Sequence, residues 1–409
     1  MKMRNTLLAL VLLVAGTLSA QVTSRNAQVP ANEKSLFERI SKIEKQNDWF
    51  NLYMNMHGAF DAKFNQDGRN GLSQGAFNMR QLRIEAKGRV NDWLSYRWRQ
   101  RLNRSNDGDG MVDNLPNSID LAYIAVQLNE KFSLTAGKQC AAYGGFEFDA
   151  NPIEIYQYSE IINNMSNFMT GVTLTYDMTP TQQWQLQILD SRNDSQEDTY
   201  GHGLEESRLP LVYTLNWNAN MFDNAWQTRW SASIMEETHG KYMYYVALGN
   251  QFNFSERCNM YVDIMSSFEQ VDRKGIMTDL FGGREKFGDQ ANPGDQANPD
   301  GRNMYNAVYN SLVAKFNYRI KPKWNVFVKG MLESAGIYED SDDVAVGNYR
   351  TSLGYVAGVE YYPMDTNLHF FLTYVGQNNF FTDRAKAIGK SDYCTQRVSL
   401  GFIYQLPLF

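Results

Sequence analysis

The 409-residue sequence has no apolar run long enough to form a transmembrane helix. The nearest candidate, Thr6 to Gly16, falls short of the roughly 20 apolar residues that a helix needs to cross a bilayer. Charged residues make up 21% of the chain and the mean hydropathy is -0.48. This polarity excludes a membrane protein built from many helices.

Residue types that build disulfides, metal sites and catalytic centres are also scarce. The three cysteines, Cys140, Cys258 and Cys394, are too few and too scattered for a disulfide framework, and they form no CxxC or zinc spacing. The four histidines lie in no motif that would pair a nucleophile with a general base. We therefore expect no catalytic residue, no metal and no cofactor, and we interpret the cysteines as isolated thiols.

The first twenty residues carry the pattern of a secretory signal sequence. Lys2 and Arg4 form the positive start, an apolar stretch follows, and Leu18-Ser19-Ala20 is a small-residue cleavage site. The alternative is a short buried helix. Export argues against a cytoplasmic enzyme.

Residues 21–48 are expected to form an N-terminal periplasmic segment that contains a short helix. Leu36, Ile40 and Ile43 recur at helical spacing between 32 and 48, with charged residues on the other face. A short coiled-coil seam is the alternative, but the pattern covers fewer than three heptads.

From Trp49 onward the sequence alternates with a period of two. Apolar residues such as Phe50, Leu52 and Met54 alternate with Asn51, Tyr53 and Asn55, and the alternation continues to Phe64. Such a strand is longer than the usual five or six residues of a soluble sheet. One apolar and one polar face over this length is what a membrane β-barrel requires, because lipid touches one side of its wall and water the other.

Fifteen further segments of this kind follow, so residues 49–409 are predicted to form a 16-stranded antiparallel transmembrane β-barrel. Short connections such as 91–93 and 129–131 alternate with long ones such as 139–167, as periplasmic turns alternate with outer loops. Strands can cross a membrane only as a closed barrel, because every backbone amide needs a hydrogen-bond partner in lipid. Sixteen strands leave a water-filled lumen. The expected strands are 49–64, 77–90, 94–104, 118–128, 132–138, 168–177, 183–190, 209–217, 225–236, 242–254, 259–270, 305–319, 324–336, 349–362, 368–376 and 396–409.

The second and third predicted strands carry a basic stripe on their polar faces. An arginine on the lipid face would cost about 2–4 kcal/mol near mid-membrane, so the charged faces must point into the lumen. The tight turn between the strands makes their inward residues neighbours, with Glu85 opposite either Arg97 or Arg99. A column of guanidinium groups on a low-dielectric wall concentrates anions. The predicted pore-lining and anion-binding residues are Arg83, Glu85, Lys87, Arg89, Arg97, Arg99 and Arg101.

The long connection 139–167 is unusually apolar for an outer loop, with Phe146, Phe148 and Ile153 among its residues. We predict that it folds into the barrel and narrows the pore, with Phe146, Glu147, Asp149 and Glu154 in the constriction. Its carboxylates, Glu160 included, would then face the basic stripe. A compact cap above the barrel is the alternative.

Three stretches of the chain resemble the phosphate-selective porin O and P family of outer-membrane channels. The first is Phe77-Asn78-Met79-Arg80-Gln81-Leu82-Arg83-Ile84, the second is Ala136-Gly137-Lys138-Gln139, and the third is Gly358 to Pro363. The resemblance implies a homotrimeric channel with an arginine-lined lumen, in which Arg80 and Arg83 match the family pattern. Gln81 stands where the family often has a second arginine.

These observations predict an outer-membrane porin that passes small hydrophilic solutes by diffusion, with a preference for anions such as phosphate. A general non-selective porin is the main alternative, and a surface or envelope-anchoring barrel is a weaker one. The expected partners are outer-membrane lipid, lipopolysaccharide, small anionic or polar solutes and further copies of the chain. No nucleic acid is expected. The sequence does not identify the solute.

Overall fold

The computed structural model describes residues 49–65, 71–104, 113, 115–201, 203–282, 303–340, 344–363 and 367–409. The predicted signal sequence and the predicted helix between 32 and 48 lie outside these residues.

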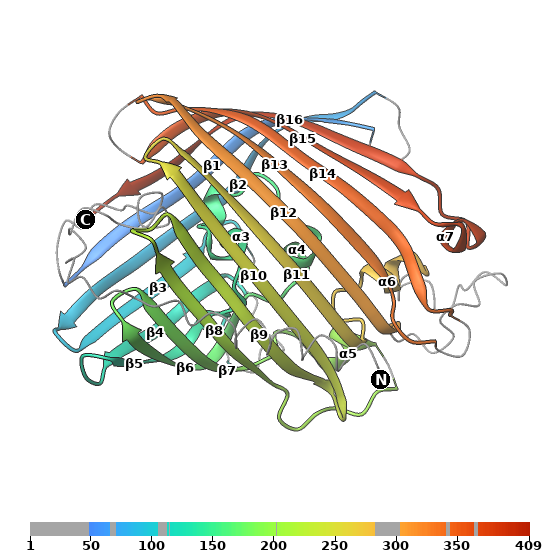
Figure 1. Cartoon of the computed structure of the whole chain (residues 1–409), viewed down its shortest axis with the longest axis horizontal. Helices are drawn as coiled ribbons and strands as arrows, with labels where there is room; N and C mark the ends of the chain where they lie inside the picture. The colour runs from blue at the N-terminus through green and yellow to red at the C-terminus, as the bar shows by residue number, and fades with distance from the viewer. Residues whose placement is uncertain are drawn as a thin grey trace. The chain divides into compact units, whose positions relative to one another are not determined.

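The described residues form sixteen antiparallel strands that close into a barrel, each paired with its neighbours in the sequence and β1 paired with β16 (Figure 1). This confirms the predicted fold. The strands are β1 (Asn51–Phe64), β2 (Leu72–Asn91), β3 (Leu94–Arg101), β4 (Ile119–Gln127), β5 (Phe132–Cys140), β6 (Phe168–Thr179), β7 (Gln182–Asp190), β8 (Leu211–Met221), β9 (Trp226–Thr238), β10 (Lys241–Ser255), β11 (Cys258–Val271), β12 (Tyr305–Lys321), β13 (Trp324–Ile337), β14 (Gly347–Tyr361), β15 (Leu368–Phe381) and β16 (Tyr393–Pro407).

The period of two in the sequence explains the two faces of the wall. In β1 the inward residues Tyr53, Asn55 and His57 are buried inside the barrel, whereas Phe60 on the opposite parity is exposed on the outside. Successive side chains of a strand point to opposite faces, so polar residues line the lumen and apolar residues face outward. Ladder hydrogen bonds on both sides of each strand satisfy the backbone.

Two strands are longer, by five residues or more, than the sequence suggested. β2 begins at Leu72 instead of 77, and β15 continues to Phe381 instead of 376. Polar or glycine-rich stretches resembled turns at these places. They are paired nevertheless: Gly75 lies opposite Ala62 of β1, and Asn378 lies opposite Leu353 of β14 and Cys394 of β16.

The barrel wall has a low side and a high side. Strands β3, β4, β5 and β7 contain 8 or 9 residues, whereas β10 to β16 contain 14 to 17. About 9–11 tilted residues are needed to cross a bilayer. The strands of the low side are therefore only just long enough to cross the bilayer, or slightly too short.

The helices that the structure describes are short and lie in the connections. They are α3 (Phe146–Asp149), the 3-10 turn η1 (Pro152–Glu154), α4 (Glu160–Asn163), α5 (Gln196–Tyr200), α6 (Ile276–Leu280) and α7 (Asp383–Ala387). None of these helices has the length and apolar composition of a membrane-spanning helix.

Candidate functional site: the basic stripe and the inward loop

The basic stripe is formed by the inward faces of β2 and β3, as their parity predicted. The ladder pairs Arg83 with Arg101, Glu85 with Arg99, and Lys87 with Arg97. Of the two positions that the sequence left open opposite Glu85, the register therefore selects Arg99. The Glu85 side chain nevertheless bonds diagonally, because Arg97 Nε donates to Glu85 Oε1 at 2.9 Å.

The arginines of the stripe differ in exposure. The Arg83 side chain is 1% exposed and that of Arg99 is 6%, whereas Arg101 is 23% and Arg97 is 34% exposed. The Arg99 and Arg101 guanidinium groups lie over the Phe168 ring, 5.3 and 5.7 Å from its centroid. Fixed cations with a partly shielded surface interact with a passing anion more strongly than freely hydrated ones do.

Asp120 of β4 is the acid at the centre of the stripe, and strict alternation did not predict it. Its Oδ1 accepts from Arg101 Nε at 2.8 Å, and its Oδ2 lies 3.3 Å from Arg99 Nε and 3.5 Å from Arg83 Nε. One carboxylate thus faces three guanidinium groups. Arg83 Nε and Nη1 have no hydrogen-bond partner among the described residues.

Two β-bulges explain why parity alone did not find all the charges that point inward. In β2 the register skips Arg80 between Met79 and Gln81, and in β4 it skips Asp120 between Ile119 and Leu121. A bulge places an extra residue opposite one partner and re-aims its side chain. Strict alternation would have put both charges on the lipid face. A charge at a lipid-facing position was therefore the sequence signal for each bulge.

The bulged Arg80 points into the lumen beside β1 and β16. It forms an ion pair with Asp61, and its Nη2 donates to Ser399 Oγ at 2.6 Å. Its Nη1 lies 3.4 Å from His57 Nε2. Arg80 thus extends the positive wall toward β16.

The loop between β5 and β6, here called the inward loop (141–167), contacts the inner wall on most sides. Gln81 of β2 donates to the Pro152 carbonyl at 3.0 Å, and Arg397 of β16 donates to the Tyr156 carbonyl at 2.6 Å. At the opposite wall the amides of Phe146 and Glu147 donate to the Asp263 carboxylate of β11, at 2.9 and 2.8 Å. Figure 1 shows its helices α3 and α4 within the ring of strands.

Glycines allow the inward loop to approach the wall closely. Gly144 and Gly145 have φ of 70° and 85°, and the Gly145 amide donates to the Arg229 carbonyl of β9 at 3.0 Å. A Cβ on Gly249 of β10 would lie 2.7 Å from the Gly145 Cα. The contact is therefore one that only glycine on both sides can make.

Aromatic packing and a buried acid hold the far end of the loop. The Tyr156 ring stacks on Phe327 of β13 at 5.2 Å, and its hydroxyl donates to Glu360 Oε1 at 2.8 Å. Glu147 accepts from both the amide and the hydroxyl of Ser159, which ties two parts of the loop together. The loop is thus a packed element and not a free segment.

The expectation that the loop carboxylates face the basic stripe is wrong. Each carboxylate has a basic side chain of another strand, β9 or one of β13 to β15, as its neighbour instead. Burial raises the pKa of Asp149 and Glu160, and the adjacent arginines oppose that rise. The pairs are Glu147 with Lys329, Asp149 with Arg229 at 3.0 Å, Glu154 with His369 at 3.6 Å, and Glu160 with Arg350.

This pairing leaves the stripe with a surplus of positive charge. Where the loop comes near the stripe it presents Tyr158. Burial raises the pKa of its hydroxyl, and Arg83 offsets part of that rise. Apart from Arg80, which pairs with Asp61, the six other cations of β2 and β3 are balanced by only two carboxylates, Glu85 and Asp120. Parity could not reveal this, because it gives the face of a residue but not its partner across the lumen.

The sequence also singled out Phe146, Arg89 and the three cysteines. Phe146 is buried, 6.3 Å from the Tyr261 ring and below the Arg229 guanidinium. Arg89 lies opposite Ser95 and is exposed. All three cysteines are free thiols. Among the described residues no group of three or more His, Cys, Asp or Glu is arranged to hold a metal ion.

A comparison with protein families matches residues 50–406 to the model described as phosphate-selective porin O and P. No curated protein matches the chain. Several solved structures share its fold at low sequence identity. The outer membrane channel DcaP of Acinetobacter baumannii is 13% identical, with a TM-score of 0.58 over 87% of this chain and 97% of that chain.

Two further structures share the fold. The anion-selective porin from Comamonas acidovorans is 8% identical, with a TM-score of 0.51 over 87% of this chain and 99% of that chain. The trimer form of OmpT of Vibrio cholerae is 12% identical, with a TM-score of 0.51 over 88% and 100% of the two chains.

Proposed function

The chain belongs to the phosphate-selective porin O and P family of outer-membrane channels, and from that premise we propose that it passes small hydrophilic anions, which it selects at the basic stripe. The uncompensated positive charge of β2 and β3 carries this proposal. One wall of the lumen is lined by Arg83, Lys87, Arg97, Arg99 and Arg101. The carboxylates of the inward loop pair with basic side chains on other strands.

The physical basis is a fixed positive field in a confined, poorly screened space. A passage lined by one sign of charge on low-dielectric walls raises the local concentration of counter-ions. Guanidinium groups add paired donors that match carboxylate and phosphate oxygens. Phosphate and small carboxylates are therefore favoured solutes, together with chloride.

We further propose that the inward loop constricts the pore and that the stripe forms the opposite side of the constriction. Phe146, Glu147, Asp149 and Glu154 hold the loop against β9, β11, β13 and β15. The passage then lies on the side of the lumen that carries the stripe. An ion crossing it passes close to Arg83 and Arg99.

The test is the reversal potential of purified protein in a planar bilayer under a salt gradient. A permeability ratio of chloride to potassium above one supports the proposal. Replacing chloride by phosphate on one side then measures phosphate permeability in the same channel. A ratio near one in potassium chloride would identify a general porin and overturn the proposed selectivity.

Assembly and processing are proposed from the same premise. The mature chain starts after residue 20 and forms a homotrimer in outer-membrane lipid and lipopolysaccharide, with residues 21–48 in the periplasm. The trimer form of a protein with the same fold supports the oligomeric state. Light scattering of the unheated protein tests it, and mass spectrometry of the exported protein locates the cleavage site. A monomeric mass in mild detergent would contradict the trimer.

A further inference from the structure

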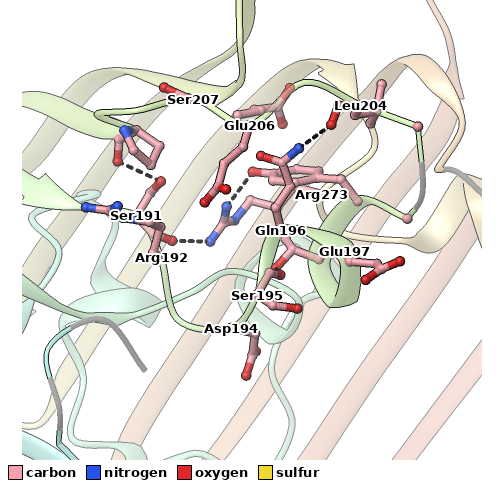
Figure 2. A pocket seen from close by; sticks show the side chains of 16 residues that line it. Ser191, Arg192, Asp194, Ser195, Gln196, Glu197, Leu204, Glu206, Ser207 and Arg273 are labelled. Carbon is pink, nitrogen blue, oxygen red and sulfur yellow. Dashed lines mark hydrogen bonds between the residues drawn. The ribbon is translucent and has the colours of Figure 1, made fainter. Parts of the chain in front are cut away.

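A cavity of about 470 Å³ lies away from the stripe, at the end of the barrel that carries the inward loop. The loop between β7 and β8 (191–210) forms most of it, and Glu237 of β9 and Arg273 after β11 complete it. This end faces the cell exterior, because the long connections of such barrels are outside. Its volume is in the range of small-molecule sites. Figure 2 shows Arg273 among the side chains of this loop.

Arg273 is a fixed cation in this cavity. Its Nη2 donates to the Ser191 carbonyl at 2.6 Å and to Ser166 Oγ at 3.2 Å, and its Nη1 donates to the Tyr200 hydroxyl. The guanidinium lies 5.6 Å from the centroid of the Tyr200 ring. A guanidinium has five N–H donors, so Nε–H and one N–H of Nη1 are left, on different edges of the group, and each can donate to one ligand oxygen.

The second arginine of the cavity is already neutralised. Arg192 bonds to both carboxylate oxygens of Asp190, with Nε 2.9 Å from Oδ1. Hydrogen bonding to Asp190 raises the pKa of Arg192. Arg273 is therefore the cation that remains available to a bound solute.

Carboxylates outnumber the cations around the cavity. Glu237 is 2% exposed, and its Oε1 has no hydrogen-bond partner among the described residues. Glu206 and Asp194 are exposed at the rim, and neither carboxylate accepts a hydrogen bond from another described residue. Burial and the nearby Asp198 raise the pKa of Asp194. An anion alone would meet a surplus of like charge here, in contrast to the stripe.

We propose that this cavity binds zwitterionic solutes, namely amino acids and short peptides with a free ammonium and a free carboxylate group. Arg273 takes the carboxylate through an unused N–H donor, and the rim carboxylates of Glu206 and Asp194 take the ammonium, with the unpartnered Oε1 of Glu237 as a further acceptor. Carboxylates bound by guanidinium and ammonium groups bound by acids are charge-assisted hydrogen bonds, the stronger class in proteins. Capture of chain termini by prearranged polar groups is an established way to recognise peptides.

The site has a direct connection to the passage. The Arg273 guanidinium that faces the cavity also donates to Ser166, near the end of the inward loop. A solute held by Arg273 is therefore at the outer mouth, next to the element that we place at the constriction. The inference concerns a separate site and does not depend on the anion preference of the stripe.

The experiment is calorimetric titration of the detergent-solubilised protein with triglycine. N-acetyl-triglycine lacks the ammonium group and triglycine amide lacks the free carboxylate, so the pair separates the two halves of the site. We expect triglycine to bind about tenfold more tightly than either analogue, the scale of one charge-assisted hydrogen bond. Equal binding of all three peptides, or binding of maltose in preference to triglycine, would overturn the proposal.

Single substitutions test whether triglycine binds in this cavity. Glu206→Gln removes an exposed charge without removing a hydrogen bond and should weaken triglycine binding about two- to fivefold. Glu205→Gln is the matched control, since Glu205 is exposed on the same segment but does not line the cavity. Arg273→Gln should abolish the preference for triglycine over triglycine amide. If Arg273→Gln misfolds, the first pair still decides.

The result is distinguishable from failure of the proposed anion preference. The reversal potential of Glu206→Gln and Glu205→Gln is measured in the same bilayers. Loss of the triglycine site with an unchanged chloride-to-potassium ratio assigns the cavity to zwitterion binding alone. If Glu206→Gln and Glu205→Gln bind triglycine equally well, the cavity is not the site.

Discussion

A single residue, Arg99, offers the sharpest test of the stripe. We expect Arg99→Glu to shift ion preference toward cations, because it changes the local charge by two units. At about 10 Å from a permeating ion, two unit charges are worth roughly 1–3 kcal/mol at effective dielectric constants between 20 and 80. The permeability ratio of chloride to potassium should fall about fivefold or more.

Arg257→Glu is the control for this substitution. Arg257 is exposed in the short turn between β10 and β11, outside the lumen stripe. It carries the same change of charge and should leave the ratio unaltered. Equal ratios in the two variants would remove the stripe from the selectivity mechanism.

Substitution of Asp120 should have the opposite effect on ion selectivity at the same site. Asp120→Asn removes the carboxylate among Arg83, Arg99 and Arg101, so anion preference should increase. Stability should fall by about 3 kcal/mol, since the loss of one partner leaves buried charges uncompensated. The reversal potential measures the first effect, and the heating temperature at which gel mobility changes measures the second. Unchanged selectivity with reduced stability would restrict Asp120 to a structural role.

The apolar–polar alternation of the sequence identified the inward cations of β2 and β3, but not all the charged residues around them. Arg83, Arg97, Arg99 and Arg101 follow from parity, because a strand without bulges has only two faces. Arg80 and Asp120 did not follow, because each occupies a bulge. Partners across the lumen, such as Lys329 for Glu147, depend on the packing of distant segments and leave no local pattern.

Among the elements, the inward loop depends on the close contact between Gly145 and Gly249. Gly249→Ala would place a Cβ against the loop backbone, and overpacking of this kind costs about 1–3 kcal/mol. We expect the loop to shift from β10 and single-channel conductance to rise. Gly330→Ala is the control, because a Cβ on Gly330 of β13 meets no atom within 4 Å.

Removal of the loop segment 144–155 tests the constriction as a whole. This deletion should raise single-channel conductance and weaken ion selectivity together. Phe146→Cys, in a background without the three native cysteines, should react slowly with a bulky impermeant thiol reagent on intact cells, because Phe146 is buried against Tyr261. Fast labelling together with unchanged conductance in the deletion variant would favour a cap above the rim.

The sequence predicted the strands of the wall well, but it predicted the contacts of the inward loop poorly. All sixteen strands were located, because each has to repeat the two-faced pattern across the membrane. The inward course of the loop was suggested by its apolar residues. Its anchors were not, since Asp263 and Glu360 are ordinary inward residues of strands far along the chain.

As a whole molecule, the protein should conduct in discrete steps. Sixteen strands enclose a lumen that their inward side chains do not fill. Purified, refolded protein with the heat-dependent gel mobility of a folded barrel should produce stepwise conductance in planar bilayers. Folded protein without such steps would contradict the open-channel assignment.

The way in which the inward loop is anchored also has a consequence for folding order. Its bonds join residues far apart in sequence: 71 positions separate Gln81 from Pro152, and 241 separate Tyr156 from Arg397. Contacts of such high sequence separation form late, after the chain between them has been ordered. The anchor strands β9 to β16 are also the last to be synthesised. The lumen thus stays wide and unselective while these strands are added, and the pore acquires its final width only when the last strand pairs with the first.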